Sequence, residues 1–141
     1  MSTWGSGPFD NDYAMDWVQD LLETKSLELI ETTLDNVVDG VADNAGELEA
    51  PFAAEALAAI DVIARLMGAR DDATEDDEID AWVARCKRKV NALLIGKAHQ
   101  AIARILSEQS ELNQLWRGSG DQAGYDDWRA GVAALEARLP A

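Results

Sequence analysis

The sequence predicts an all-α fold, a compact single-domain array of about six to seven helices with an irregular, docked N-terminal segment. Apolar residues recur at spacings of three and four along nearly the whole chain, and no stretch alternates strictly enough to predict a strand. The 141 residues suffice for one domain, and a hydrophobic share of 48% is typical of globular proteins. A domain of this size forms a core without disulfides or metal ions.

Two helices are expected in the first forty residues. Asp10 or Asn11 can cap the first, which ends near Thr24, and Ser26 can cap the second, which stops at or shortly before Gly40. Their apolar stripes contain Ala14, Trp17, Val18, Leu21 and Leu22, then Leu27, Ile30, Leu34, Val37 and Val38. Residues 40–50 are expected to form a loop.

A third helix is expected between Pro51, which fits a first helical turn, and Gly68, which suits a helix C-terminus. Residues 69–78 are too charged for a core element and are predicted to form an acidic loop. Thr74 and Asp77 in this loop have the spacing of a capping box for the next helix.

The fourth and fifth helices are expected on either side of Gly96, where the sequence predicts a break or kink. The inward residues are expected to be Ile79, Trp82, Val83, Cys86, Val90, Leu93 and Leu94, then Ala98, Ile102, Ile105 and Leu106. Ser110 can cap a short sixth helix, and residues 118–121 form a turn. The last helix repeats threes and fours through Tyr125, Trp128, Val132, Leu135 and Leu139.

Charge is distributed unevenly. Residues 1–78 carry 20 acidic and 3 basic side chains, a net of -17, whereas residues 79–106 carry one acid against six bases, a net of +5. The basic region therefore either lies against the acidic half or offers a separate patch to anions. The formal net charge of -15 opposes nucleic acid and anionic lipid, so we expect a protein partner, with no nucleic acid and no membrane.

The chain shows no signal-peptide pattern and no long apolar run, and its single cysteine suits a reducing compartment. We therefore expect a cytoplasmic protein. Cys86 lies on an apolar stripe and is predicted to be a buried, unreactive thiol, and the single histidine, His99, is expected to be packed or exposed rather than catalytic.

The N-terminal segment WGSGPFDND is the most distinctive part of the sequence, since two glycines, a proline and two aromatic residues would serve no purpose in a free tail. One interpretation makes it a lid over the helices, with Asp10 or Asn11 as a cap. The other makes it a binding loop that presents Asp10 and Asp12 at a helix N-terminus. The candidate residues are Trp4, Gly5, Gly7, Pro8, Phe9, Asp10, Asn11 and Asp12.

Asp12, Asp16 and Asp20 are four residues apart, so they share one helix face, either as a solvated acidic stripe or as ligands for a hard cation. No Walker A string, dinucleotide fingerprint, nucleophile elbow or zinc spacing occurs, so we expect no catalytic, cofactor-binding or metal residues and no cofactor. Carboxylates alone can do acid–base work, so the sequence leaves an enzyme open but gives it no support.

Trp17, Trp82 and Trp128 lie on apolar stripes and are predicted to be in the core. Trp116 precedes Arg117, and this pair suits either the core or a protein interface, in which tryptophan and arginine are enriched.

Three segments together resemble the bacterial domain-of-unknown-function family 4259. They are the opening WGSGPFDNDYAMDW, the SELNQLW string at residues 110–116, and the terminal tryptophan–leucine helix from residue 128 to residue 139. Arg117 and Gly118 depart from the acidic residue expected after the LW pair. The resemblance implies a small, mostly helical cytoplasmic protein, and it implies no activity.

The leading functional hypothesis is a non-enzymatic protein-binding module that acts through its acidic face, such as an immunity-type inhibitor of a basic toxin. Asp16, Asp20, Trp116 and Arg117 are the candidate interface residues. The alternative is a carboxylate-based metal-binding protein or hydrolase using Asp10, Asp12 and Asp16. A homo-oligomer formed through exposed helical stripes is a third interpretation.

Overall fold

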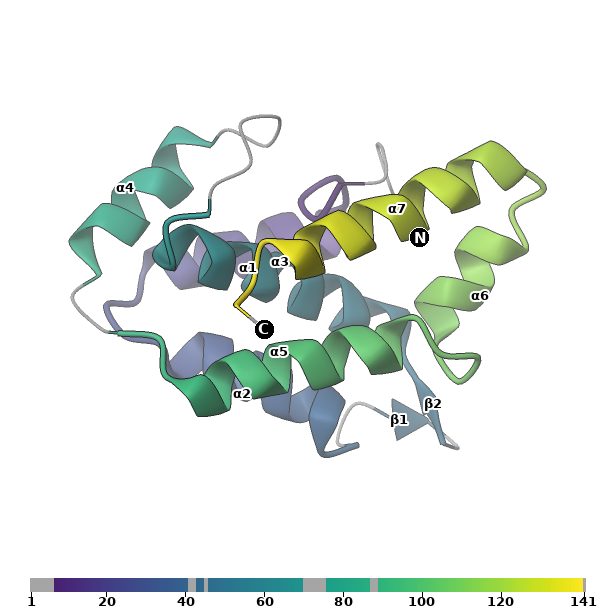
Figure 1. The fold of residues 1–141 in the computed structure, drawn as a ribbon, viewed down its shortest axis with the longest axis horizontal. Coiled ribbons are helices and arrows are strands. Elements are labelled where there is room, and N and C mark those ends of the chain that lie inside the picture. The colour runs from purple at the N-terminus through teal and green to yellow at the C-terminus, as the bar shows by residue number, and fades with distance from the viewer. Residues whose placement is uncertain (1–6, 41–42, 45, 70–75, 87–88, 141) are drawn as a thin grey trace.

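The structure is a computed structural model that describes residues 7–40, 43–44, 46–69, 76–86 and 89–140 (Figure 1). These residues form seven helices and one short antiparallel strand pair, which confirms the all-α prediction. In chain order the elements are α1 (Asp12–Leu22), α2 (Glu28–Val38), β1 (Asp43–Asn44), β2 (Glu47–Leu48), α3 (Ala50–Leu66), α4 (Asp77–Arg85), α5 (Ala92–Ile105), α6 (Glu111–Arg117) and α7 (Gln122–Ala137).

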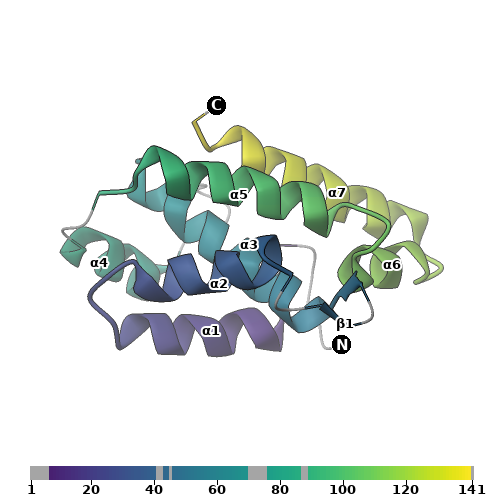
Figure 2. The same cartoon turned by 90° about the horizontal axis from the view of Figure 1, so that it is seen from below.

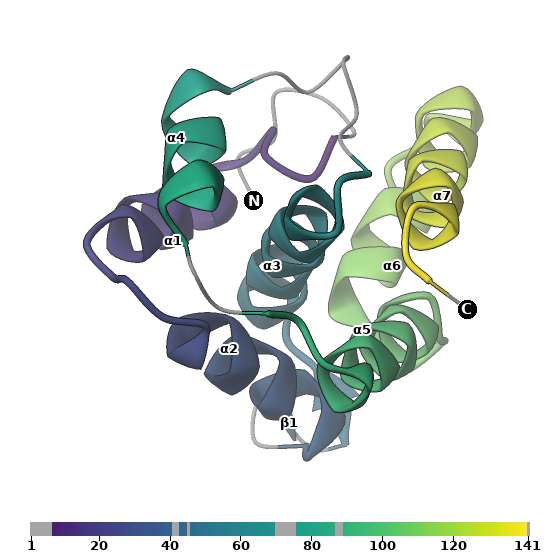
Figure 3. The same ribbon diagram turned by 60° about the vertical axis from the view of Figure 1, so that its left-hand side comes forward.

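Helix α3 lies at the centre of the molecule, and the other six helices of the described chain surround it (Figure 3). It is buried on nearly every side, because its many alanines allow neighbouring helices to approach closely. Its first turn contains Pro51, as expected, and Gly68 follows its end with a φ of 84°.

The remaining helices form two groups about α3. Helices α1 and α2 lie on one side of it, linked by a Trp17–Thr33 hydrogen bond, and α5 and α7 lie side by side on the other (Figure 2). Helix α4 packs on α1 and α3, and α6 packs on α3 and α7. No described helix is long and apolar enough to cross a membrane.

The predicted core tryptophans are confirmed, since Trp17, Trp82 and Trp128 are all buried. Two of them also make hydrogen bonds between elements. Trp17 Nε1 donates to Thr33 Oγ1 at 2.8 Å and joins α1 to α2, and Trp82 Nε1 donates to the Thr24 carbonyl at 2.9 Å and joins α4 to the α1–α2 turn. Burial of an indole with its N–H satisfied stabilises these helix contacts.

Residues 40–50 are not only a loop, as the sequence predicted. Asp43 pairs with Leu48 and Asn44 with Glu47 in a two-residue antiparallel ladder. Leu48 is fully buried, and its N–H donates to the Gln109 carbonyl at 2.8 Å. A ladder of two residues is too short to show the alternation by which strands are recognised.

The predicted break at Gly96 is wrong. Helix α4 ends at Arg85, and α5 begins after Asn91, whose Oδ1 accepts a hydrogen bond from the Leu94 N–H at 2.8 Å. Gly96 lies inside α5, because a helical glycine costs only about 1 kcal/mol and a side-chain cap at Asn91 favours a new start there. The break turns Leu93 outward, with 69% of its surface exposed, although Leu94 is buried as expected.

Three smaller predictions also require correction. The N-cap of α2 is Leu27 rather than Ser26, although Ser26 Oγ accepts from the Glu28 N–H at 3.3 Å. The predicted cap Thr74 lies outside the described residues, and the N-cap of α4 is Asp76, whose Oδ1 accepts from two backbone N–H groups. Cys86 is only half-buried, because it lies at the end of α4 rather than within a continuous helix.

Candidate functional site

Part of the N-terminal segment forms a closed turn that leads into α1. Trp4 and Gly5 lie outside the described residues. The Gly7 N–H donates to Asp10 Oδ2 at 3.0 Å, and the Asp10 N–H donates to the Gly7 carbonyl at 3.1 Å. A Cβ at Gly7 would lie 2.8 Å from Asp10 Oδ2, so this close turn requires glycine. The Asp10 carboxylate is therefore engaged with the backbone of its own segment.

Asn11 is the N-cap of α1, one of the two caps that the sequence allowed. It is buried, and its Oδ1 accepts from the Ala14 N–H at 2.8 Å. Pro8 and Phe9 are half-buried; Phe9 packs against the core, and its ring lies 5.7 Å from the guanidinium carbon of Arg65. In the described part of the segment, these contacts match the lid interpretation better than the binding loop.

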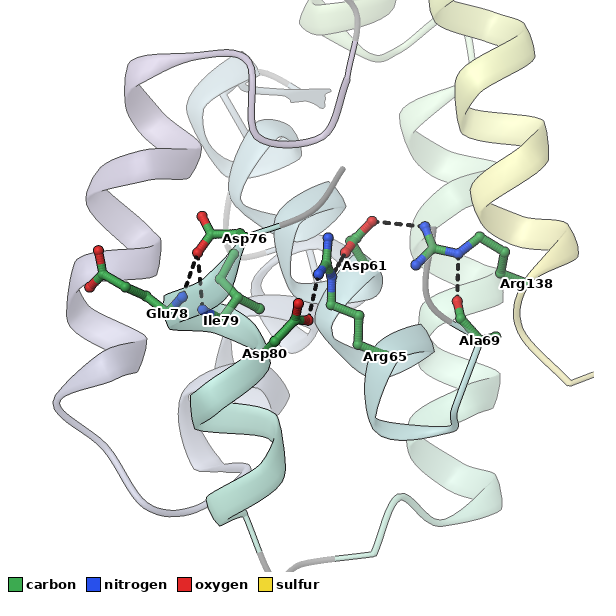
Figure 4. Close-up of polar contacts among 8 residues, drawn as sticks. All are labelled: Asp61, Arg65, Ala69, Asp76, Glu78, Ile79, Asp80 and Arg138. Carbon is green, nitrogen blue, oxygen red and sulfur yellow. Dashed lines mark hydrogen bonds and ion pairs between the residues drawn. The ribbon is translucent and has the colours of Figure 1, made fainter. Parts of the chain in front are cut away.

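Arg65 belongs to a buried ion network that sequence reasoning missed (Figure 4). Asp61 on α3 has no exposed surface; its Oδ1 accepts from Arg65 Nε at 2.6 Å and its Oδ2 from Arg138 Nη1 at 2.8 Å. Arg65 Nη1 also donates to Asp80 Oδ1 on α4 at 2.8 Å. The network therefore connects α3, α4 and the end of α7 beneath the Phe9 ring.

Two opposite effects act on the pKa of Arg65 in this network. Burial alone lowers the pKa of the Arg65 guanidinium, but the hydrogen bonds and negative charges of Asp61 and Asp80 raise it further than burial lowers it. Arg138 Nε donates to the Ala69 carbonyl at 2.7 Å, and its Nη2 is buried without a hydrogen-bond partner among the described residues. The local signal for the network was an Asp–Arg pair four residues apart within the alanine-rich helix α3.

The predicted acidic stripe exists as an exposed surface. Asp12, Asp16 and Asp20 lie on α1, and all three are exposed. Glu55 on α3 is half-buried, and its burial, followed by the negative charge of Asp20, raises its pKa. Among the described residues, no group of three or more histidine, cysteine, aspartate or glutamate side chains is placed to hold a metal ion.

The basic region contacts the acidic half through α5. Lys97 Nζ lies 2.7 Å from Asp35 Oδ1 on α2, and Arg104 Nη1 donates to the Val37 carbonyl at 2.9 Å. The hydrogen bond to Asp35 raises the pKa of Lys97, burial opposes this effect, and further nearby carboxylates add to it. These contacts fit the internal charge complementarity that the sequence suggested.

The second candidate interface lies where α6 meets α7. Trp116 is half-buried and stacks on Trp128, with ring centroids 6.2 Å apart and planes at 11°. Arg117 is exposed, and so is Leu115, with 46% of its surface accessible. Trp116 therefore belongs to the edge of the core, next to two exposed residues.

Comparison with known proteins identifies the chain at the family level. A family model described as a domain of unknown function, DUF4259, matches residues 2–131. The chain belongs to this family. No curated protein and no solved structure matches it. The DUF4259 match includes the N-terminal turn and the acidic residues of α1. It also includes three members of the ion network, Asp61, Arg65 and Asp80, but it ends before Arg138.

Proposed function

We propose that this DUF4259 chain is a non-enzymatic protein-binding module that uses an acidic surface on α1 and α2 against a basic partner. The observation that carries the proposal is the exposure of carboxylates along both helices, which follow one another in the chain (Figure 2). We use the name acidic α1–α2 surface for the exposed carboxylates Asp12, Asp16, Asp20, Glu23, Glu28 and Glu31. Between residues 12 and 31 of the sequence, the only basic residue is Lys25.

A shallow groove at one end of this surface supports a basic partner. It has a volume of about 560 Å³ and is lined by Ser26, Leu27, Glu28, Glu31 and Lys89. Within the described lining, two carboxylates stand against one ammonium, so this lining is negative. Lysine and arginine side chains combine an apolar stem with a charged head, which matches carboxylates beside an apolar residue such as Leu27.

Charge complementarity of this kind accelerates association and selects partners of opposite sign. Carboxylates that stay in water until a partner arrives are suited to this role, because internal ion pairs have not already neutralised them. The pair between Lys97 and Asp35 lies at the α2–α5 contact, and Glu31 is close enough to add to the raised pKa of Lys97. Within the described residues, none of the six carboxylates forms an ion pair. An immunity-type inhibitor of a basic toxin is one form of this function, and a toxin-like reading frame beside the gene would support that form.

The proposal is tested by affinity capture from an extract of the source cell with three immobilised baits. They are the wild-type chain, the double variant D16N/D20N on α1, and the matched control D126N/D127N, which removes two exposed carboxylates from α7. We expect one or more basic proteins on the wild-type and control baits, reduced on the α1 variant and eluted by raised salt. Equal recovery on all three baits, or no protein that salt elutes, would refute the proposal.

A further inference from the structure

The single histidine of the chain contacts the segment that follows α7. His99 lies on α5, and its two ring nitrogens contact different groups. Nδ1 is 2.9 Å from Glu136 Oε2 in the last turn of α7, and Nε2 is 2.7 Å from the Pro140 carbonyl oxygen. These contacts join residues 37 and 41 positions apart in the sequence.

The chemistry of the two partners fixes the protonation state that fits this geometry. A carbonyl oxygen and an ionised carboxylate only accept hydrogen bonds. A neutral imidazole has one N–H and one bare nitrogen, so it can donate to Glu136 or to Pro140 but not to both. Only the doubly protonated ring of His99 satisfies both contacts.

We propose that His99 is a proton-dependent latch on Leu139 and Pro140, closed while the ring carries both protons and open once it has lost one. Loss of a proton places a nitrogen lone pair against the Pro140 carbonyl or the Glu136 carboxylate, and that contact becomes repulsive. Leu139 lies within the latched segment and is buried in the core, so its release uncovers apolar surface.

Of the described charged groups on neighbouring elements, Glu136 is the one that contacts the ring. Most of the others are already engaged with different partners. On α2, Asp35 pairs with Lys97, and Glu28 and Glu31 line the groove. On α3, Glu55 lies near Asp20, and Asp61 and Arg65 belong to the ion network. On and after α7, Arg129 lies over Tyr125, Asp126 accepts from Gln122, Asp127 is exposed, and Arg138 bonds Asp61.

The direction of the pH effect follows from these contacts. The hydrogen bond to Glu136, and then the one to Pro140, raise the pKa of His99 above its ordinary value, while partial burial opposes them. The latch is therefore closed below the ordinary value of about 6.5 and opens as pH rises through the raised pKa. Arg138 stays bonded to Asp61 throughout, so opening is confined to the residues beyond it.

The test follows the ring and the segment in the same sample by NMR on the full chain. The ring nitrogens of His99 are titrated from acid to alkaline pH, and amide exchange is measured at Leu139, whose N–H donates to the Glu136 carbonyl at 3.0 Å. We expect His99 to titrate above pH 6.5. Across the same interval, Leu139 exchange should rise about fivefold beyond intrinsic base catalysis, the factor for losing one typical hydrogen bond.

Three variants separate the latch from general loosening of the fold. E136Q should lower the pKa of His99 and shift the step in Leu139 exchange to lower pH, and H99Q should abolish the step. D127N, an exposed change on the same helix, should leave both unchanged. A His99 pKa at or below 6.5, a Leu139 profile without a step in the wild-type chain, or a step that persists in H99Q would overturn the proposal.

Discussion

Replacing Asp61 with asparagine tests the role of the ion network in holding the helices together. Both carboxylate oxygens of Asp61 accept, Oδ1 from Arg65 and Oδ2 from Arg138, and the side chain has no exposed surface. Asparagine has nearly the same shape but offers a single acceptor oxygen. In Asp61→Asn, one arginine therefore faces an amide NH₂ group, and both arginines lose the negative charge of Asp61.

The expected loss of stability follows from burial and from the partners that remain. Removing one member of a buried charge pair costs about 3–5 kcal/mol, because the other charge stays uncompensated. Arg65 keeps Asp80 at 2.8 Å and the Arg138 side chain is 17% exposed, so we expect the lower end, about 3 kcal/mol. This corresponds to a fall in melting temperature of roughly 10 °C for a chain of this length.

Urea unfolding followed by far-ultraviolet circular dichroism at pH 7 measures the free energy of unfolding directly. The matched control is Asp126→Asn, because Asp126 is exposed on α7 and bonds only the neighbouring Gln122 side chain within the described residues. The control should change stability by less than about 0.5 kcal/mol. A loss below about 1 kcal/mol in Asp61→Asn, with an unchanged denaturant slope, would refute the argument that the network stabilises the fold.

Three further predictions concern single contacts. Asn11→Ala removes the side-chain cap of α1 and should lower the free energy of unfolding by about 1 kcal/mol in urea unfolding; an unchanged midpoint would contradict the cap. Glu55→Gln should raise stability at pH 7, by less than about 1 kcal/mol, and leave it unchanged near pH 4. The sign follows because burial and Asp20 raise the pKa of Glu55, so the folded chain loses stability as pH rises through that pKa; equal effects at both pH values would contradict this cause. Thr33→Val leaves the buried Trp17 N–H without its acceptor and should cost about 1–3 kcal/mol in thermal unfolding; a neutral result would show that the bond contributes nothing.

The helices were predictable because their causes are local. Apolar spacing and capping side chains act within a few residues, so Asn11 and Ser110 mark the starts of α1 and α6 in both sequence and structure. The break before α5 was misplaced because the glycine signal at Gly96 is weak compared with the cap at Asn91. The strand pair that contains Leu48 was missed because two residues carry no periodicity.

The candidate site was predictable only in part, because only some of its contacts have local causes. The exposure of Asp16 and Asp20 follows from helical spacing, which places them opposite the apolar stripe. The carboxylate of Asp10 was expected to serve as a cap or a ligand, and instead it closes a turn with Gly7, which depends on backbone geometry. The bond between Asp61 and Arg138 spans 77 residues, and no local pattern predicts such a contact.

The most direct test of the proposed function is the association rate constant with the captured basic protein, measured by stopped-flow at rising salt concentrations. We predict that the rate constant falls steeply with salt, and that D16N/D20N lowers it about three- to tenfold at low salt while D126N/D127N changes it little. The dissociation rate should change less than the association rate in both variants. An association rate that depends neither on salt nor on Asp16 and Asp20 would contradict binding through the acidic α1–α2 surface.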